Sequence, residues 1–463
     1  MNRTREPRRP RILYLSFYFP PSRASGVYRA RATANYLAAQ GWEVTAFASP
    51  LEFLHNVIGS VDEQLAETVD PSIRVERPKI SHFAWERDLR HFSRFRGMSP
   101  VLARNIYNFG LKKFFPEHYL SWAAAAVRKA VKMHARRRFD VVLATGNPFA
   151  SFAAAWMIHK LTGVPFAVDY RDAWTLNMFT EEPAYEPDHP AWKWERRILR
   201  DASASVFVNQ PLRTWYAERY PDAADRMMVV PNGWDPDLLT QLESAGAPST
   251  SDDARPLRFA FLGTMNNTQP VEQLAEAFEL ARRHPELADA ELNIHGHLGY
   301  FKQSQAELMG RLGLPGGEGG HSLPDTGIHY RGPVSKTEVG KVYQENDVLV
   351  FLAAGARYVT SGKIFEYMAS GSPIVSVHKP GIAAQDVLAG YPLWFNPNSL
   401  DVNDIAEAMI AAGKAARDMT PEQRAVAQAH AASFTREAVT APLEARLRGM
   451  VKRGIAGGGE TRS

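Results

Sequence analysis

The side chains best suited to chemistry are a lysine and a glutamate, three positions apart, in the last third of the chain. Lys363 follows the small-residue turn Thr360-Ser361-Gly362, and Glu366 lies in the first turn of a predicted helix. A helix N-terminus presents free N–H groups, so the turn and the lysine together suit an anion such as phosphate. The carboxylate of Glu366 can accept hydrogen bonds from both hydroxyls of a ribose. An ordinary N-cap, with a solvated lysine and a glutamate that complements the helix dipole, is the alternative.

Two other loops could hold a phosphate group through their backbone N–H groups. Pro20–Gly26 precedes a predicted helix, and Phe261–Met265 places Gly263 and Thr264 directly after a predicted strand. Neither loop contains G-x-G-x-x-G, so the dinucleotide-binding signal is weak, and the lack of G-x-x-x-x-G-K-[ST] excludes a P-loop. For the first loop taken alone, a tight turn without a ligand is the favoured interpretation.

A charged pair, Arg171 and Asp172, follows the predicted strand Pro165–Asp169. Ligands of open α/β sheets bind at the carboxyl ends of the strands, so this pair is well placed for function. A salt bridge that only fixes the loop is an equally good interpretation.

The sequence offers no convincing metal site. It contains no cysteine, and His295 and His297 flank a glycine with no third ligand nearby. Two ligands at this spacing make a poor zinc site, and His295 is better interpreted as the wall of a ligand pocket. Asp235-Pro236-Asp237 follows an Asn-Gly pair and is interpreted as turn chemistry.

Alternating apolar strands and amphipathic helices must position these residues. The strand Arg11–Ser16, the helix Val27–Gln40 and the strand Glu43–Ala48 open a series that recurs along the chain. This order predicts an α/β fold with two doubly wound, Rossmann-like domains that face each other across a cleft.

The predicted domain limits follow changes in composition. They are an N-terminal domain at 1–243 with a basic, aromatic insertion at 80–138, a polar linker at 244–256, a C-terminal domain at 257–430, a helix at 431–454 that could return to the N-terminal domain, and a disordered tail at 455–463.

The overall composition, 45% hydrophobic and 22% charged residues in 463, is that of a globular protein. No run approaches the roughly 18 apolar residues of a membrane-spanning helix. The apolar run Ile12–Phe19 is short and has no signal-peptide cleavage site, so we expect a cytoplasmic protein.

The insertion at 80–138 concentrates positive charge. It carries 13 Lys and Arg residues against three acids, a net charge of +10 in a chain whose total is +4, and ten aromatic residues are interleaved. Cations near an anionic bilayer contribute up to about 1 kcal/mol each, so peripheral binding to the inner membrane face, or to an anionic acceptor, is expected. The alternative is a solvated helical pair whose aromatics pack on the first domain. No recognition motif supports nucleic acid.

The segment Ser361–Val375 resembles the donor-binding signature of the retaining glycosyltransferases of family 4 (group 1), which have the GT-B fold. The Pro-Pro loop ending at Gly26, the Pro-Asn-Gly turn at Val230–Gly233, and the stretch His329–Val334 match further family motifs in the right order. The resemblance covers nearly the whole chain. It is closest to a branch typical of bacterial polysaccharide and lipid-linked saccharide assembly.

This resemblance implies transfer of a sugar from a UDP-linked nucleotide sugar to a saccharide or lipid-linked saccharide, with retention and without a metal or other cofactor. It makes Arg171 and Asp172 the candidate catalytic pair, which would hold the sugar or the attacking hydroxyl, and Ser25 and Gly26 the acceptor loop. The implied donor-binding residues are Gly263, Thr264, His295, Pro333, Val334, Tyr358, Ser361, Gly362, Lys363 and Glu366.

Two departures from the family pattern concern the donor. Many members have a second glutamate eight positions before Glu366, where this chain has Tyr358, and an Arg and a Lys where residues 264–269 have neither. Lys363 is then the main phosphate partner. The alternative functions are transfer to a small secondary metabolite, nucleotide-sugar epimerisation, and a non-catalytic nucleotide-sugar-binding subunit.

Overall fold

The computed structural model describes residues 8–59, 61–81, 83–86, 88–239, 255–299, 302–314, 326–335 and 338–457. The chain divides into two compact units, Met1–Pro231 with Val439–Ser463, and Asn232–Ala438. Most of the predicted linker, 244–254, and the end of the predicted tail, 458–463, lie outside the described residues.

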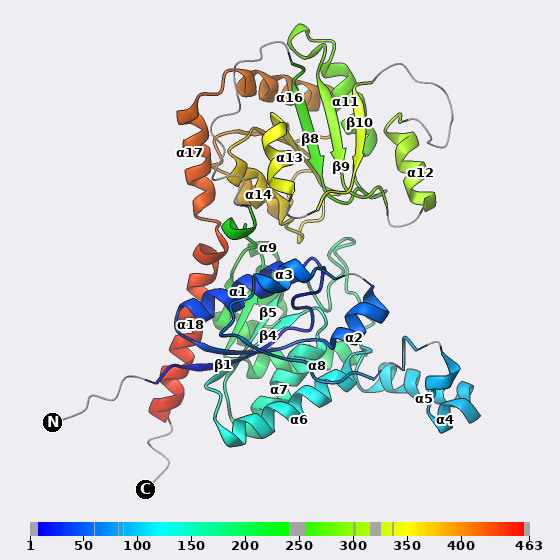
Figure 1. Ribbon diagram of the computed structural model, residues 1–463, viewed down its shortest axis with the longest axis vertical. Helices are drawn as coiled ribbons and strands as arrows, with labels where there is room; N and C mark the ends of the chain where they lie inside the picture. Colours follow the sequence, from blue (N-terminus) through cyan, green and yellow to red (C-terminus); the bar gives the residue numbers. More distant parts are fainter. Residues whose placement is uncertain are drawn as a thin grey trace, which may run out of the picture. The chain divides into compact units, whose positions relative to one another are not determined.

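The first unit is built on a parallel sheet with the strand order β3-β2-β1-β4-β5-β6-β7 (Figure 1). The strands are β1 Arg11–Leu15, β2 Glu43–Phe47, β3 Arg74–Glu76, β4 Val141–Gly146, β5 Phe166–Tyr170, β6 Ala204–Phe207 and β7 Met227–Val229. The helices are α1 Val27–Ala39, α2 Leu51–Phe53, α3 Glu63–Glu67, α4 Arg94–Met98, α5 Pro100–Lys113, α6 Leu120–Arg136, α7 Ala150–Thr162, α8 Pro190–Asp201, α9 Gln210–Arg219 and most of α18 Arg436–Gly457.

Helices cover both faces of this sheet. All five residues of β1 are buried, as expected for a central parallel strand, which has a core on each side. On one face, Leu37 of α1 and Leu443 and Leu447 of α18 share a core with Ile12. The last helix therefore packs on the first unit, and Trp42 Nε1 donates to Glu444 Oε1 at 2.9 Å.

The second unit has a parallel sheet in the order β10-β9-β8-β11-β12-β13. Its strands are β8 Arg258–Leu262, β9 Glu291–His295, β10 Ile328–Gly332, β11 Val348–Leu352, β12 Ile374–Val377 and β13 Trp394–Phe395. Its helices are α11 Val271–Ala281, α12 Lys302–Arg311, α13 Val339–Glu345, α14 Lys363–Ser370, α15 Ala383–Leu388, α16 Val402–Arg417 and α17 Pro421–Ala432.

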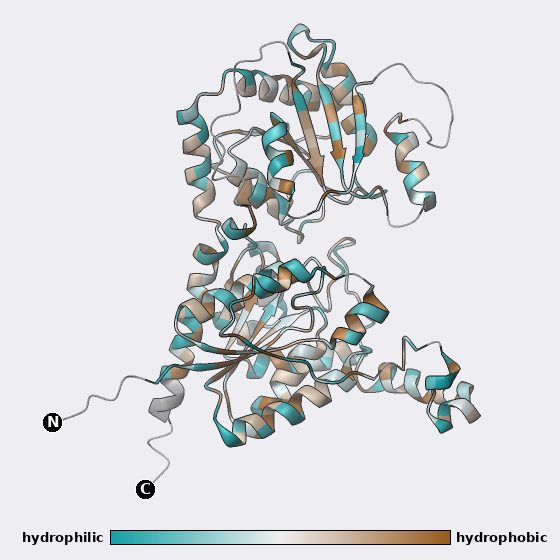
Figure 2. Cartoon of the chain, in the orientation of Figure 1, coloured by the Kyte–Doolittle hydropathy of each residue, from teal (hydrophilic) through white to brown (hydrophobic). Residues whose placement is uncertain are grey.

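Alternate residues of β8 face two separate cores. Phe259 and Phe261 pack with α11 and α16, whereas Ala260 and Leu262 pack with α13, α14 and α17. This alternation follows from the two-residue period of a strand between two helical layers. Figure 2 shows the result as hydrophobic colour on β8 and hydrophilic stretches on the helices around it. The predicted pair of doubly wound sheets is confirmed.

The first unit ends at Pro231, earlier than the boundary predicted at residue 243. The reason is Trp234, whose indole Nε1 donates to Ala431 O at 2.8 Å and whose backbone bonds to Phe434 and Arg436. Asp235 forms an ion pair with Arg436 at 3.4 Å. These contacts tie the segment after Pro231 to the second unit, which the polar composition further along the chain did not reveal.

Candidate functional site

The N-terminus of α14 gathers four of the predicted donor-binding residues. Its N-cap, Gly362, has no side chain that could cap the helix. The Lys363 N–H donates to Ser361 Oγ at 3.3 Å. Lys363 Nζ lies 3.4 Å from Glu366 Oε2. The first-turn N–H groups of a helix have no intrahelical acceptor, so this end concentrates positive potential around a lysine.

Glu366 is held by a second element. Tyr343 of α13 donates its hydroxyl to Glu366 Oε2 at 2.7 Å, and the glutamate side chain is only 13% exposed. Burial raises the pKa of Tyr343 well above its ordinary value, so this phenol remains a donor. Lys363 and Tyr343 converge on one carboxylate oxygen and thereby fix the orientation of Glu366. Sequence reasoning missed Tyr343, which lies on a different helix.

The same helix is tied to the carboxyl end of β8. The Tyr367 hydroxyl accepts from the Leu262 N–H at 3.0 Å, which places the start of the Gly263 loop beside α14. Gly263 has φ +152°, and Gly296, after β9, has φ +127°. A Cβ on Gly296 would lie 1.8 Å from Gly263 O, so the loops that follow β8 and β9 touch through their glycines.

These two loops also pair through their backbones. The Gly263 N–H donates to His295 O at 2.9 Å, and the Met265 N–H donates to His297 O at 2.8 Å. Gly263, Thr264 and His295 are thus neighbours at the carboxyl ends of β8 and β9. Burial and the nearby Arg331 lower the pKa of His295, which keeps its imidazole neutral at pH 7.

The remaining predicted donor residues lie in other surroundings. Tyr358 is buried at 6% exposure, with the guanidinium of Arg357 5.7 Å from its ring centroid. Val334 packs against the core beneath α13 and α14, and Pro333 is exposed. Their contacts with a donor remain predictions.

His378 is a candidate that sequence reasoning missed. It follows β12 directly, is 1% exposed, and its Nε2 has no hydrogen-bond partner among the described residues. Its Nδ1 lies 2.7 Å from Lys379 O, and burial lowers its pKa. A histidine at the carboxyl end of a strand was the available signal, since His378 follows β12 and His295 is the last residue of β9.

In the first unit, the structure joins the predicted acceptor loop to the predicted catalytic pair. Arg171 lies against Gly26, so closely that a Cβ on Gly26 would be 1.1 Å from Arg171 Nη1. Arg171 also pairs with Asp172 at 2.9 Å, with the two side chains 16% and 37% exposed. The salt bridge proposed as the structural alternative is present, and the glycine is what allows the guanidinium to approach the loop.

A buried ion pair supports this arrangement. Arg29 of α1 makes two hydrogen bonds with Asp169 at the end of β5, at 2.8 and 2.9 Å, and a third with Pro231 O at 2.8 Å. Both side chains are no more than 5% exposed. Sequence reasoning missed Arg29 because its partner is 140 positions away.

A buried carboxyl group anchors the loop that carries Arg171. Glu195 of α8 accepts hydrogen bonds from Thr175 Oγ1 at 2.5 Å, Tyr216 at 2.9 Å and Tyr220 at 2.7 Å. Burial raises the pKa of Glu195 to about 7, although the three hydroxyl donors oppose the shift. The end of this loop therefore rests on α8 and α9.

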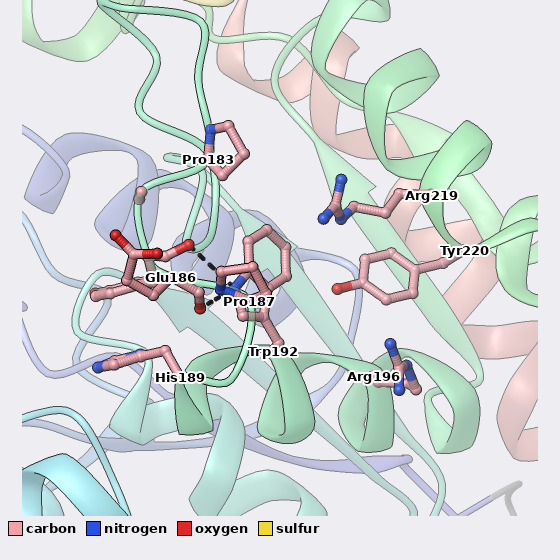
Figure 3. A pocket seen from close by; sticks show the side chains of 10 residues that line it. Pro183, Glu186, Pro187, His189, Trp192, Arg196, Arg219 and Tyr220 are labelled. Carbon is pink, nitrogen blue, oxygen red and sulfur yellow. Dashed lines mark hydrogen bonds between the residues drawn. The ribbon is translucent and has the colours of Figure 1, made fainter.

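Beside Glu195 opens a pocket of about 770 Å³ (Figure 3). Tyr185 is among the lining residues, and Figure 3 shows Trp192 facing Arg219 and Tyr220 across the pocket. The guanidinium of Arg219 lies 4.2 Å from the Trp192 ring centroid. Aromatic faces beside a few polar groups are typical of pockets for small organic ligands.

A second pocket, of about 740 Å³, lies between the edge strand β3 and α6. Seven cations and one acid line it, namely Arg74, Arg77, Lys79, Arg128, Lys129, Lys132, Arg136 and Glu76. Glu76 pairs with Lys129 and Arg74, so the excess of positive charge in this pocket suits an anion.

Within the described residues, no group of three or more His, Asp or Glu side chains could hold a metal ion. None of the described helices combines the length and apolar character needed to cross a bilayer.

Two family models match this chain. One, a glycosyl transferase 4-like domain, matches residues 26–233, and the other, glycosyl transferases group 1, matches residues 256–413. No curated protein matches the sequence.

Several solved structures share the fold over almost the entire chain. A glycosyltransferase from Rickettsia africae superposes with a TM-score of 0.63 at 12% identity, covering 96% of this chain and 99% of its own. Sucrose-phosphate synthase from Thermosynechococcus elongatus gives 0.60 at 16% identity, with coverage of 97% and 100%. HepE from Anabaena, in complex with UDP and glucose, gives 0.59 at 13% identity, with coverage of 95% and 100%. The predicted GT-B fold is confirmed.

Proposed function

Because this chain belongs to the group 1 glycosyltransferases, we propose that it moves a sugar from a UDP-linked donor to a saccharide or lipid-linked saccharide, with retention and without a metal. The observation that carries the donor assignment is the α14 N-terminus, where Gly362, Lys363 and the oriented carboxylate of Glu366 lie within one helical turn.

The donor would be bound mainly by backbone groups and one lysine. The first-turn N–H groups of α14 and Lys363 would receive the diphosphate, and Glu366 the ribose hydroxyls. Charge develops on the diphosphate as the bond to the sugar breaks, and preorganised donors stabilise that charge more than they stabilise the ground state. The structural neighbour HepE was solved with UDP and with UDP-glucose, which supports a UDP-linked donor.

The transfer step would use no covalent nucleophile. The acceptor oxygen bonds to the anomeric carbon as the carbon–oxygen bond to the diphosphate breaks, and the leaving phosphate oxygen takes the hydroxyl proton. Both events occur on the same face of the sugar, which retains its configuration. Arg171, which lies against Gly26, and its ion-pair partner Asp172 would hold the sugar or the acceptor hydroxyl.

The acceptor would bind to the first unit. The pocket around Trp192 and Arg219 is on the elements that anchor the Arg171 loop, and its aromatic faces suit the C–H faces of a sugar ring. A lipid-linked acceptor would bring the protein to a membrane surface.

A thermal-shift panel of nucleotides and nucleotide sugars tests the donor site. We expect UDP or a UDP-sugar to raise Tm by a few degrees, because a ligand that binds only the folded state stabilises it. Glu366→Ala should abolish this shift. Glu422→Ala is the matched control, since Glu422 is also a first-turn acid of a helix in the second unit but is exposed. Absence of a shift with every nucleotide would refute the donor site.

A further inference from the structure

Exposed apolar side chains gather on one short part of the first unit. Of the 15 large hydrophobic side chains that are exposed among the described residues, eight lie between residues 89 and 114. They are Leu89, Phe95, Met98, Val101, Leu102, Ile106, Phe109 and Phe114, with exposures from 51% to 85%. Isolated exposed hydrophobics need no explanation, but a concentration of this kind marks an interaction surface.

Three of these exposed residues form one face of α5. Leu102, Ile106 and Phe109 follow at i, i+4 and i+7, the spacing of a helical face, and each is more than half exposed. A neighbouring face of α5, one residue further along the chain from each ridge residue, packs against the rest of the first unit. Its members are Ala103, which is buried, and Tyr107, which stacks on Phe83 at 4.5 Å. The helix is therefore held by one side and presents an apolar ridge on another.

This ridge stands away from the core. Figure 1 shows α4 and α5 projecting from the sheet and from the other helices of the first unit. Figure 2 shows hydrophobic and hydrophilic segments alternating along α5. By contrast, several aromatics that made this region look suited to a membrane are structural. Trp122 and Phe115 are no more than 1% exposed, and Trp85 packs edge-on to Phe53 at 4.9 Å. For these residues, packing on the first unit is confirmed.

Cations flank the ridge. Residues 88–114 contain six Lys or Arg residues and one acid, a net charge of +5. The acid, Asp88, already pairs with Arg90 at 2.6 Å, and Arg104, Lys112 and Lys113 of α5 are exposed.

We propose that α4 and α5 form a membrane-docking element, in which the ridge Leu102, Ile106 and Phe109 enters the acyl boundary of an anionic bilayer and the surrounding cations contact its headgroups. Apolar side chains flanked by Lys and Arg are the composition of interfacial helices. A second copy of this chain fits less well, because a symmetric contact would place the same cations opposite one another. This inference does not depend on the proposed transferase activity.

Vesicle binding by the full chain tests this directly. The parent protein should sediment with vesicles of 30% phosphatidylglycerol in phosphatidylcholine. The triple variant Leu102→Ser/Ile106→Ser/Phe109→Ser should bind these vesicles at least about tenfold more weakly. The matched control is Leu161→Ser/Phe179→Ser/Val426→Ser, which removes three side chains with exposures of 67%, 69% and 61%. This control should bind like the parent, and both variants should keep the parent's Tm because the altered side chains are exposed.

Because the chain has no cysteine, a single introduced cysteine can be labelled specifically with a dye, which provides a second readout. An environment-sensitive dye on Phe109→Cys should shift to the blue when the anionic vesicles are added, and the same dye on Val426→Cys should not. Parent-level binding by the ridge variant, or no binding by the parent, would overturn the proposal. A parent dimer that the ridge variant converts to a monomer, seen by analytical ultracentrifugation, would assign the ridge to self-association instead and would also overturn it.

Discussion

The two units build their candidate sites in different ways. In the second unit, Ser361, Gly362, Lys363 and Glu366 are neighbours in the sequence and on one helix end, and a single hydroxyl from Tyr343 completes the arrangement. In the first unit, Gly26 meets Arg171 and Arg29 meets Asp169 only because distant segments fold together. The candidate site of the second unit depends on helix geometry, whereas that of the first unit depends on a buried network of charges and hydroxyls. Single side-chain changes at the candidate site should therefore lower stability far more in the first unit than in the second.

The largest expected effect is the loss of Asp169. Asp169→Ala would leave the buried Arg29 without its carboxylate, which should lower the free energy of unfolding by about 3–5 kcal/mol. Urea denaturation measures this. The control is Asp172→Ala, because the more exposed pair with Arg171 should contribute at most about 1 kcal/mol. Equal losses in the two variants would contradict the distinction between a buried network and a surface pair.

Glu195 should make the first unit sensitive to pH. Its pKa is about 7 in the folded protein and about 4.5 when unfolded, so the folded state retains a proton that the unfolded state releases between these values. Protonated Glu195 therefore contributes fully to the free energy of unfolding below pH 4.5. This contribution falls by about 3 kcal/mol as the pH rises to 7. The difference in unfolding free energy between the parent and Glu195→Gln, measured across this range, should show the slope. A difference that is flat from pH 4.5 to 7 would contradict it.

In the second unit, the glycine contact should matter most. Gly296→Ala would place a Cβ against Gly263 O and force a strained φ, which should cost about 1–3 kcal/mol and more if the loops separate. Gly332→Ala is the control, since Gly332 also has a positive φ but open space around it. We expect the first variant to melt at a clearly lower temperature than the second, and the reverse order would show that the two loops can move apart freely.

The smallest effect concerns Tyr343. Tyr343→Phe removes the hydroxyl that orients Glu366, and we expect UDP affinity to fall by up to about tenfold while stability changes little. Titration calorimetry with UDP measures this. Tyr391→Phe serves as control because its hydroxyl donates to Ser372 O at 2.8 Å, within the core of the same unit. Unchanged affinity in Tyr343→Phe would mean that Glu366 keeps its orientation without help.

Local patterns predicted much of this molecule. Runs such as Leu257–Leu262 and Val348–Leu352 are apolar because parallel strands are covered on both faces, so both sheets could be recognised. The exposed edge strand β3, Arg74–Glu76, has no such pattern and was missed. The boundary at Pro231 was also missed, because the indole of Trp234 fixes it through contacts with residues near 431–436.

The sequence by itself determined the two doubly wound sheets and was enough to predict an anion site at the α14 N-terminus, because both depend on spacings of a few residues. Only the tertiary structure decided that Arg171 lies on Gly26, that Tyr343 orients Glu366, and which apolar residues of 89–114 remain exposed. The physical reason is the separation along the chain of the residues that interact. Helical and strand periodicities are fixed by neighbouring dihedral angles, whereas a buried ion pair or an uncovered helical face is defined by what distant segments do or do not place against it.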